Sequence, residues 1–87
     1  MLEKVKTALR ITHNYLNDDI NDTIATSRME MIRSGVAVDV ANSDDELIQM
    51  AIKTYCLAHF SNNEKMAEGY QKSFELQLDN IRKSSGY

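Results

Sequence analysis

A helix formed by residues 44–60 would be apolar around most of its circumference. Its apolar side chains are Leu47, Ile48, Met50, Ala51, Ile52, Tyr55, Leu57, Ala58 and Phe60. A helix of this kind is usually covered on most sides by the other elements of its domain. The preceding run Ser43-Asp44-Asp45-Glu46 fits a capping box, with Ser43 as the N-cap and Glu46 reaching back to its amide. The sequence therefore predicts a core helix at 44–60, around which the rest of the chain must pack.

Two helices are predicted before this core helix, because apolar residues recur there every three or four positions. The first covers residues 2–10, and its apolar side is formed by Leu2, Val5 and Leu9. The second covers residues 17–34 and begins with carboxylates, which suit the positive end of a helix dipole. Gly35 follows it and fits the left-handed position that ends many helices. The predicted buried side of this helix comprises Ile20, Ile24, Ser27 and Met31, widened by Met29 and Ile32.

A fourth helix is predicted over residues 64–82, after Asn63, which can serve as its N-cap. Gly69 lies inside this helix and weakens it by about 1 kcal/mol relative to alanine. Residues 83–87 show no periodic pattern, so we expect them to form a flexible C-terminal tail. The apolar stripe of the fourth helix consists of Ala67, Tyr70, Phe74, Leu78 and Ile81.

Residues 36–42 break the helical pattern, because Val36, Val38 and Val40 stand at every second position. A period of two is typical of a short strand. An isolated strand leaves backbone groups and apolar side chains without partners. We therefore expect an irregular or short β-like segment between the second and third helices, which pairs with another chain or packs over the helices.

These elements together predict an all-α fold, a four-helix small domain that spans residues 1–82. The chain has 87 residues, which is enough for a single domain with one modest core. It has no proline and three glycines, which argues against an all-β fold with many turns. Any further stability is expected to come from self-assembly or from a partner.

The charge of the chain is slightly acidic and unevenly distributed. The formal net charge is −3, although residues 1–12 hold three basic side chains and one acidic side chain. Because no segment forms a basic stripe that could neutralise phosphates, direct DNA binding by the monomer is disfavoured. No apolar run approaches the ~20 residues that span a bilayer, and the charged start of the chain does not fit a signal peptide. The single cysteine excludes an internal disulfide and fits a reducing compartment.

Side chains able to carry chemistry are scattered along the sequence. His13 and His59 lie far apart, and neither has a second histidine at helical spacing. Cys56 lies on the most apolar helix and is interpreted as a small buried hydrophobe, and the acidic run at 18–22 lacks the glycine and final glutamate of an EF-hand. We therefore expect no catalytic, cofactor-binding or metal-binding residues. The methionines at helical positions are interpreted as core filler: Met29, Met31, Met50 and Met66.

The order and spacing of these features resemble the small head–tail connector (adaptor) proteins of long-tailed bacteriophages and prophages, often called DNA packaging proteins. The resemblance covers nearly the whole chain, although each motif alone is generic. It rests on the order of these segments, before a final helix and a serine-rich end at Tyr87: Leu9-Arg10-Ile11-Thr12-His13, Asn17-Asp18-Asp19-Ile20, Gly35-Val36, Leu47-Ile48-Gln49-Met50-Ala51-Ile52-Lys53 and Tyr55-Cys56-Leu57-Ala58-His59-Phe60.

The resemblance implies a structural subunit without enzymatic activity. Such subunits assemble into a homo-oligomeric ring, typically dodecameric, beneath the portal protein of the filled capsid. The ring extends the channel through which DNA passes and provides the platform for a stopper or tail-completion protein. It further implies a location at the virion head–tail junction, with the host bacterial cytoplasm as the site of assembly and no membrane partner.

A ring needs contacts in which one face of a subunit meets a different face of its neighbour. We expect these contacts on the first helix and on the valine segment, at Leu2, Val5, Leu9, Val36, Val38 and Val40. The alternative function is a small helical regulator that binds DNA or a protein partner. A helix-turn-helix needs a recognition helix with base-reading side chains, and the helix at 44–60 is too apolar for that role. The sequence therefore favours the connector over the regulator.

Overall fold

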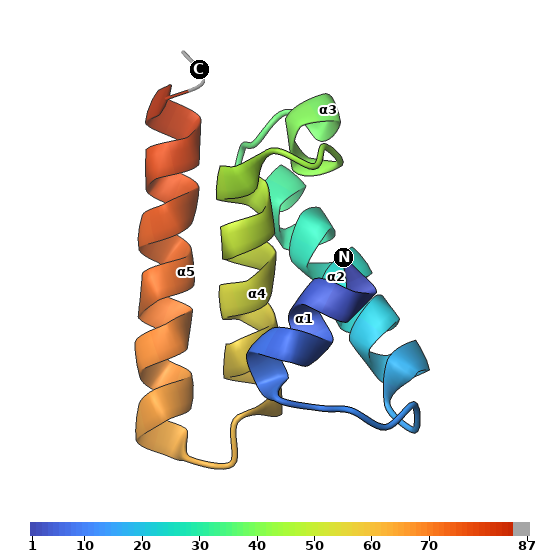
Figure 1. Cartoon of the computed structure of the whole chain (residues 1–87). Helices are drawn as coiled ribbons and strands as arrows, with labels where there is room; N and C mark the ends of the chain where they lie inside the picture. The colour runs from blue at the N-terminus through green and yellow to red at the C-terminus, as the bar shows by residue number, and fades with distance from the viewer. Residues whose placement is uncertain (85–87) are drawn as a thin grey trace.

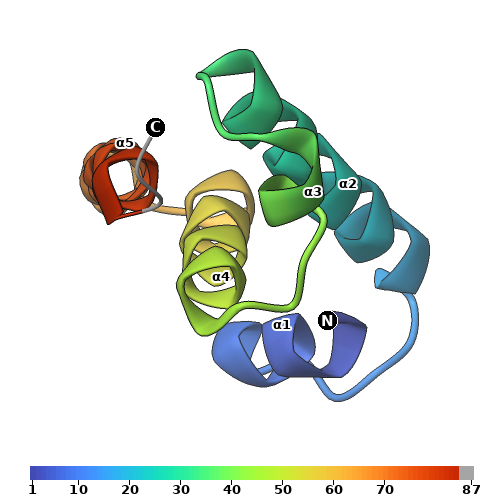
Figure 2. The same cartoon turned by 90° about the horizontal axis from the view of Figure 1, so that it is seen from above.

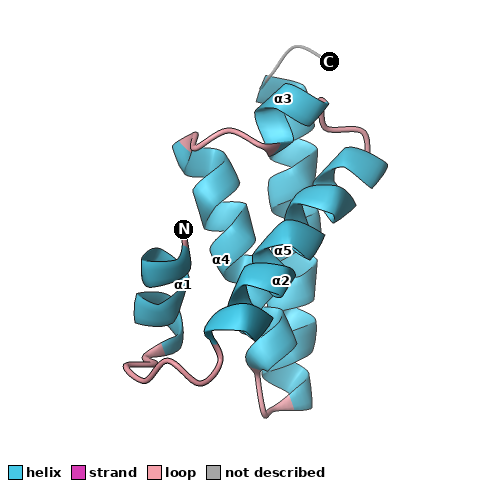
Figure 3. Ribbon diagram, turned by 90° about the vertical axis from the view of Figure 1, so that its right-hand side faces the viewer, coloured by secondary structure: helices cyan, strands magenta, loops and turns pink. Residues whose placement is uncertain are grey.

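The computed structural model describes residues 1–84, which form helices and loops only (Figure 3). This confirms the predicted all-α fold, whereas the predicted number of four helices is wrong because a short extra helix forms. The helices in chain order are α1 (Leu2–Leu9), α2 (Asn17–Arg33), α3 (Val38–Ala41), α4 (Glu46–Phe60) and α5 (Glu64–Ser84).

Helix α4 lies at the centre of the molecule, as its apolar sequence predicts. It packs against α1, α2 and α5 (Figure 1). Seen from above, α5 and α2 lie on opposite sides of α4, and α1 lies alongside it (Figure 2). Burial of each large aliphatic side chain contributes about 1.5–3 kcal/mol, so this helix supplies much of the core. Its buried residues are Ile48, Ala51, Ile52 and Cys56.

The start of α4 differs from the predicted capping box. The N-cap is Asp45, whose Oδ1 accepts a hydrogen bond of 2.9 Å from the amide of Leu47. Ser43 instead donates its hydroxyl to the carbonyl of Val40 at 2.7 Å and accepts from the amide of Asp45 at 3.3 Å. The hydroxyl of Ser43 thus accepts the amide of Asp45, not that of Glu46 as in a capping box, and the helix begins two residues later than predicted.

Helix α2 ends as the sequence predicts, at a glycine in the left-handed region. Gly35 has φ 111°, and its amide donates to the carbonyl of Ile32 at 3.0 Å. The amide of Val36 donates to the carbonyl of Met31, also at 3.0 Å. These two bonds form a Schellman motif, with the buried side chains of Val36 and Met31 as its apolar contact. The predicted buried side at Ile20, Ile24, Ser27 and Met31 is confirmed.

The predicted β-like segment at 36–42 is wrong. Val36 belongs to the Schellman motif, and residues 38–41 form the single turn of α3. The amide of Ala41 donates to the carbonyl of Ala37 at 2.9 Å, and that of Asn42 to Val38 at 3.1 Å. A helical turn satisfies these backbone groups locally, whereas a strand here would have no partner strand within residues 1–84.

The guanidinium of Arg28 holds α2 against the loop between α3 and α4. Its Nη1 donates to the carbonyls of Ala41 at 2.8 Å and Ser43 at 2.9 Å, and Nη2 lies 3.8 Å from a carboxylate oxygen of Asp44. This side chain is mostly buried, so it satisfies carbonyls that the short helix leaves free.

Helix α5 pairs with α4 after the loop at 61–63 (Figure 1). Asn63 caps it as predicted, because its Oδ1 accepts a bond of 3.1 Å from the amide of Met66. The helix continues through Ser84 instead of ending at Arg82. The predicted tail at 83–87 is therefore helical at its first two residues, and the remainder lies outside the described residues. Phe74, Leu78 and Ile81 of the predicted stripe are buried, and Ala67 and Tyr70 are half-buried.

Candidate assembly surface

The side chains that could carry chemistry are not brought together. Within residues 1–84, no group of three or more His, Cys, Asp or Glu side chains could hold a metal ion. The ring of His13 lies 5.1 Å from that of Tyr15, and the ring of His59 lies 4.9 Å from that of Phe60. Burial raises the pKa of the Cys56 thiol to about 12, so it is protonated at neutral pH and is not a nucleophile.

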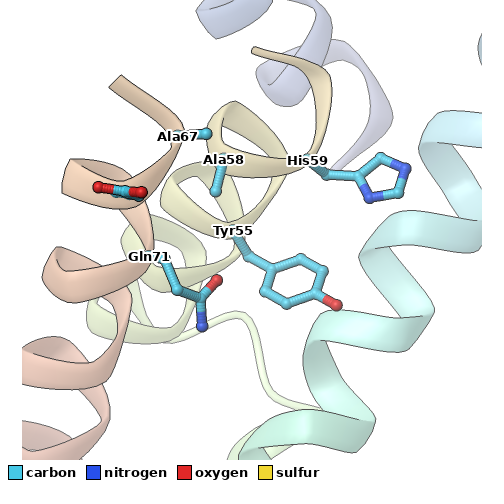
Figure 4. Close-up of a pocket in the computed structure, with 6 residues that line it drawn as sticks. Tyr55, Ala58, His59, Ala67 and Gln71 are labelled. Atoms are coloured by element: carbon cyan, nitrogen blue, oxygen red, sulfur yellow. The ribbon is translucent and has the colours of Figure 1, made fainter. Parts of the chain in front are cut away.

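A pocket of about 320 Å³ lies between α4 and α5 near the loop that joins them. Tyr55 and His59 extend from α4 in the direction of α2, and Gln71 approaches from α5 (Figure 4). Burial is the main cause that raises the pKa of Tyr55, with the nearby Glu30 carboxylate adding to it. The phenol is therefore neutral at physiological pH, and its ring packs on Phe74 at 5.0 Å between centroids. The arrangement is that of a packing contact between helices.

The six residues predicted to form a subunit interface occupy different environments. Val5 and Val36 are buried in the core of the subunit, so their side chains are not available to a neighbour. Leu2, Leu9 and Val40 are half-buried and pack against the same core. Val38 alone of the six is exposed, with 59% of its surface accessible. The prediction of an interface at these residues stays a prediction.

Four exposed apolar residues on α4 and α5 were not predicted as surface. The sequence predicts Leu47 and Met50 on the core helix and Met66 as core filler, yet about half of each side chain is exposed. On α5, Leu76 is 67% exposed. The interpretation of the methionines as core filler holds for Met31 and is wrong for the other three. Met50 is exposed because the three helices packed on α4 leave part of its circumference open, whereas Met29 lies on the side of α2 opposite its buried residues.

The charges of α5 are confined to one flank of the helix. At about 100° per residue, the acidic and basic residues are equal in number and fall within one arc beside the buried stripe: Glu64, Lys65, Glu68, Lys72, Glu75, Asp79, Arg82 and Lys83. At the edge of this arc nearest the stripe, Nη1 of Arg82 donates to the carbonyl of Ser34, just after α2, at 3.0 Å. Glu68 likewise lines the pocket with Tyr55 and His59. A helical-wheel projection of residues 64–84 could have shown from the sequence that the charged residues of this helix lie on one side.

The opposite flank of α5 carries no charged side chain and continues onto α4. Gln77 and Asn80 of this flank line a groove together with Leu47, Met50 and Ile81. A second groove, of about 530 Å³, extends from Leu47 and Ile81 to Val40 of α3, and the carboxylates of Asp39 and Asp45 also line it.

A second apolar surface lies on the outer side of α2. Ala25 and Met29 are exposed there, and Ile32 is half-buried. We call these three residues the α2 stripe. Met29 and Ile32 line a shallow hollow with Glu30 and Arg33. The stripe points away from α4, since it lies opposite the buried side of α2. Helix α2 itself lies on the other side of α4 from α5 (Figure 2).

The geometry does not favour the regulator that the sequence left as an alternative. A helix-turn-helix presents its second helix to the DNA groove. Here α4 is covered by α1, α2 and α5, and α5 lies side by side with α4 instead of crossing it steeply (Figure 1). The described residues thus hold their long helices in a packed bundle that offers surfaces to other proteins.

Comparison with known proteins decides the family. The sequence model of the phage connector protein family matches residues 1–84. The chain belongs to the phage connector protein family. This confirms the resemblance found in the sequence. Searches of the curated proteins and of the solved structures returned no match.

Because the chain belongs to this family, its general role is that of a structural protein of the phage particle. The family consists of structural proteins, and it fits a location where the head meets the tail. No described helix has the length and hydropathy needed to span a bilayer. The exposed apolar surfaces on α2, α4 and α5 are therefore the features to examine for contacts with other proteins.

Proposed function

We propose that this chain is the subunit of a ring beneath the portal protein at the head–tail junction of a long-tailed phage. The match to the connector family over residues 1–84 carries this proposal. In the proposed role the ring, dodecameric on the portal, extends the DNA channel and provides the platform for a stopper or tail-completion protein. Assembly takes place in the cytoplasm of the bacterial host, where heads are filled.

The distribution of apolar surface supports a subunit with more than one neighbour. Each subunit of a ring uses two different faces, because heterologous contacts close a ring. The connector chain exposes apolar side chains on α2, α4 and α5, and α2 and α5 lie on opposite sides of α4 (Figure 2). Val38 on α3 and the half-buried Leu2 and Leu9 on α1 remain candidates for further contacts.

The charge distribution supports passage of DNA without tight binding. The net charge is −3, and α5 carries equal numbers of acidic and basic residues. Near the N-terminus, Lys4 donates to Gln49 at 2.6 Å and Lys6 donates to Asn14 at 2.8 Å, so both ammonium groups are held by the subunit's own side chains and keep their charge. A channel built from such subunits would be near neutral or acidic, so DNA could slide without being retained.

Electron microscopy of portal-containing heads tests the proposed function. Heads lacking their connector are mixed with the purified chain, and the portal end is averaged with and without it. The expected result is an added ring of density beneath the portal. Heads without a portal are the matched control and should gain no density. Portal ends that are unchanged at saturating protein would refute the connector role.

A further inference from the structure

The groove of about 530 Å³ lies where α3, the start of α4 and the end of α5 meet, and it joins apolar side chains to carboxylates. Leu47 is 48% exposed in it, although it belongs to the most apolar helix of the chain. The groove therefore offers apolar surface and negative charge side by side. The apolar and acidic residues that line it are Asp39, Val40, Asp45, Leu47, Ile48 and Ile81.

The two carboxylates of the groove have no cationic partner within residues 1–84. Neither Asp39 nor Asp45 forms an ion pair there. Oδ1 of Asp45 accepts the amide of Leu47, which leaves its second carboxylate oxygen available. The nearby Arg28 is directed at Asp44 and at two backbone carbonyls instead. The negative charge at the groove is therefore free to act on a partner.

The sequence around the groove adds to this negative charge. Residues 36–52, which supply α3 and the start of α4, hold four carboxylates and no Lys or Arg. The basic residues after Ile81 on α5 are both paired with Asp79, since Nη2 of Arg82 lies 3.5 Å and Nζ of Lys83 lies 2.8 Å from its carboxylate oxygens. The groove thus attracts cationic groups and repels the phosphates of DNA.

We propose that this groove binds a segment of another protein of the phage particle in which a Lys or Arg side chain lies next to apolar side chains. In this contact the apolar side chains cover Val40 and Leu47, while the cationic group pairs with Asp39 and Asp45. Complementary charge selects such a segment over an acidic one. This inference rests on the proposed function for the kind of protein that is bound, whereas the groove is complete in the single subunit.

Titration of the whole isotopically labelled chain with a peptide tests the proposal. The probe is a short synthetic peptide of alternating leucine and lysine, and binding is followed by nuclear magnetic resonance of the backbone amides. The expected result is a saturable shift of amides around the groove, such as those of Val40, Leu47 and Ile81. A peptide with glutamate in place of lysine should cause no shift, and one with serine in place of leucine should bind more weakly. Shifts elsewhere but not at the groove would overturn the proposal.

Two variants remove the charges of the groove and keep the fold. Asp39→Asn changes an exposed side chain, and Asp45→Asn retains an N-cap, because asparagine caps helices as well as aspartate does. Each should weaken binding of the leucine–lysine peptide about threefold, and both together about tenfold. Asp22→Asn is the matched control, since it removes an exposed carboxylate from the half of α2 far from α3 (Figure 1). Equal weakening by all three variants would show a general attraction to an acidic chain and overturn the proposal.

The remaining outcomes separate this proposal from its alternatives and from the connector role. If the groove amides shift with the concentration of the chain alone, a second copy occupies the groove and the proposal is overturned. If microscopy shows an added ring but the peptide does not bind, the groove proposal is overturned and the connector role stands. If the peptide binds at the groove but no ring is added to the portal, the connector role is overturned and the preference of the groove for a basic, apolar segment stands.

Discussion

Two backbone positions, Gly35 and Gly69, show how differently one residue type is used along this chain. Gly35 has φ 111° and closes α2 in a conformation that side chains with a Cβ rarely adopt. Gly69 lies in the middle of α5, where a Cβ would meet nothing within 4 Å. The first glycine is required by the backbone, whereas the second only adds conformational freedom to the unfolded chain.

We predict that Gly69→Ala raises the free energy of unfolding by about 0.5–1 kcal/mol, because alanine has the higher helix propensity and no atom obstructs it. Gly35→Ala is the matched control and should lower it by about 1 kcal/mol or more. Urea denaturation of the two variants beside the unaltered chain measures both changes. Equal effects of the same sign would contradict this account of the two glycines.

The thiol of Cys56 is predicted to be unreactive in the folded chain. Burial raises its pKa from 9.0 to about 12, so at pH 8 a thiol reagent should react only after unfolding in urea. The thiol ionises at a lower pH in the unfolded chain than in the folded chain. The free energy of unfolding should therefore fall as the pH rises from about 9 towards 12. A Cys56→Ala control should lose this component of the pH dependence. Rapid labelling of the native protein would show that the core opens at this site.

At the scale of elements, the start of α4 depends on one carboxylate. Oδ1 of Asp45 accepts the amide of Leu47 at 2.9 Å, and α4 contacts three other helices. Asp44 lies next to it but makes only a 3.8 Å ion pair with Arg28, and its side chain is 85% exposed. Loss of this cap should therefore weaken the element on which the whole core is assembled.

We predict that Asp45→Ala lowers the free energy of unfolding by about 1 kcal/mol, the usual cost of losing an N-cap. Asp44→Ala removes the same charge from the adjacent position and should cost less than half as much, because exposed ion pairs contribute little. Thermal unfolding followed by circular dichroism compares the two variants. If both lose the same stability, the effect is one of net charge and not of capping.

At the scale of the whole molecule, exposed apolar residues matter for what the chain contacts more than for its own stability. Val38 is 59% exposed on α3, so a polar residue is tolerated there by the monomer. We predict that Val38→Asp weakens assembly while the monomer stays helical, because a charge would have to be buried at a contact. Sedimentation and circular dichroism report the two properties separately. Unchanged oligomers in this variant would exclude Val38 from the interface.

The affinity for DNA depends on the charge of the whole molecule and not on a single residue. We predict that the isolated chain binds duplex DNA no more tightly than non-specific proteins do at physiological salt, with Kd in the range of about 10⁻⁶–10⁻⁴ M or weaker. Gel shifts at two salt concentrations measure the affinity and its salt dependence. A nanomolar, strongly salt-dependent Kd would favour the regulator and contradict a channel through which DNA slides.

The local sequence determined the helices and the central place of α4. Ile20, Ile24 and Met31 identify the buried side of α2, because helical geometry brings residues at this spacing onto one face. Gly35 and Asn63 mark the ends of helices, because capping involves only a few neighbouring residues. The sequence pattern also carried the resemblance to the connector family, since the order of these signals along the chain is itself specific.

The tertiary structure decided which apolar residues are left exposed. Helical periodicity already places Met31 on the buried side of α2 and Met29 opposite it, whereas the exposure of Met50 on the apolar α4 follows only from how α1, α2 and α5 pack around that helix. The tertiary structure likewise turned the valine segment into a Schellman motif and a helical turn, because Val36 finds a place in the core. The exposure of a side chain depends on contacts between helices that are distant in the chain. Local periodicity identifies the apolar side of one helix but does not say which other helices cover it.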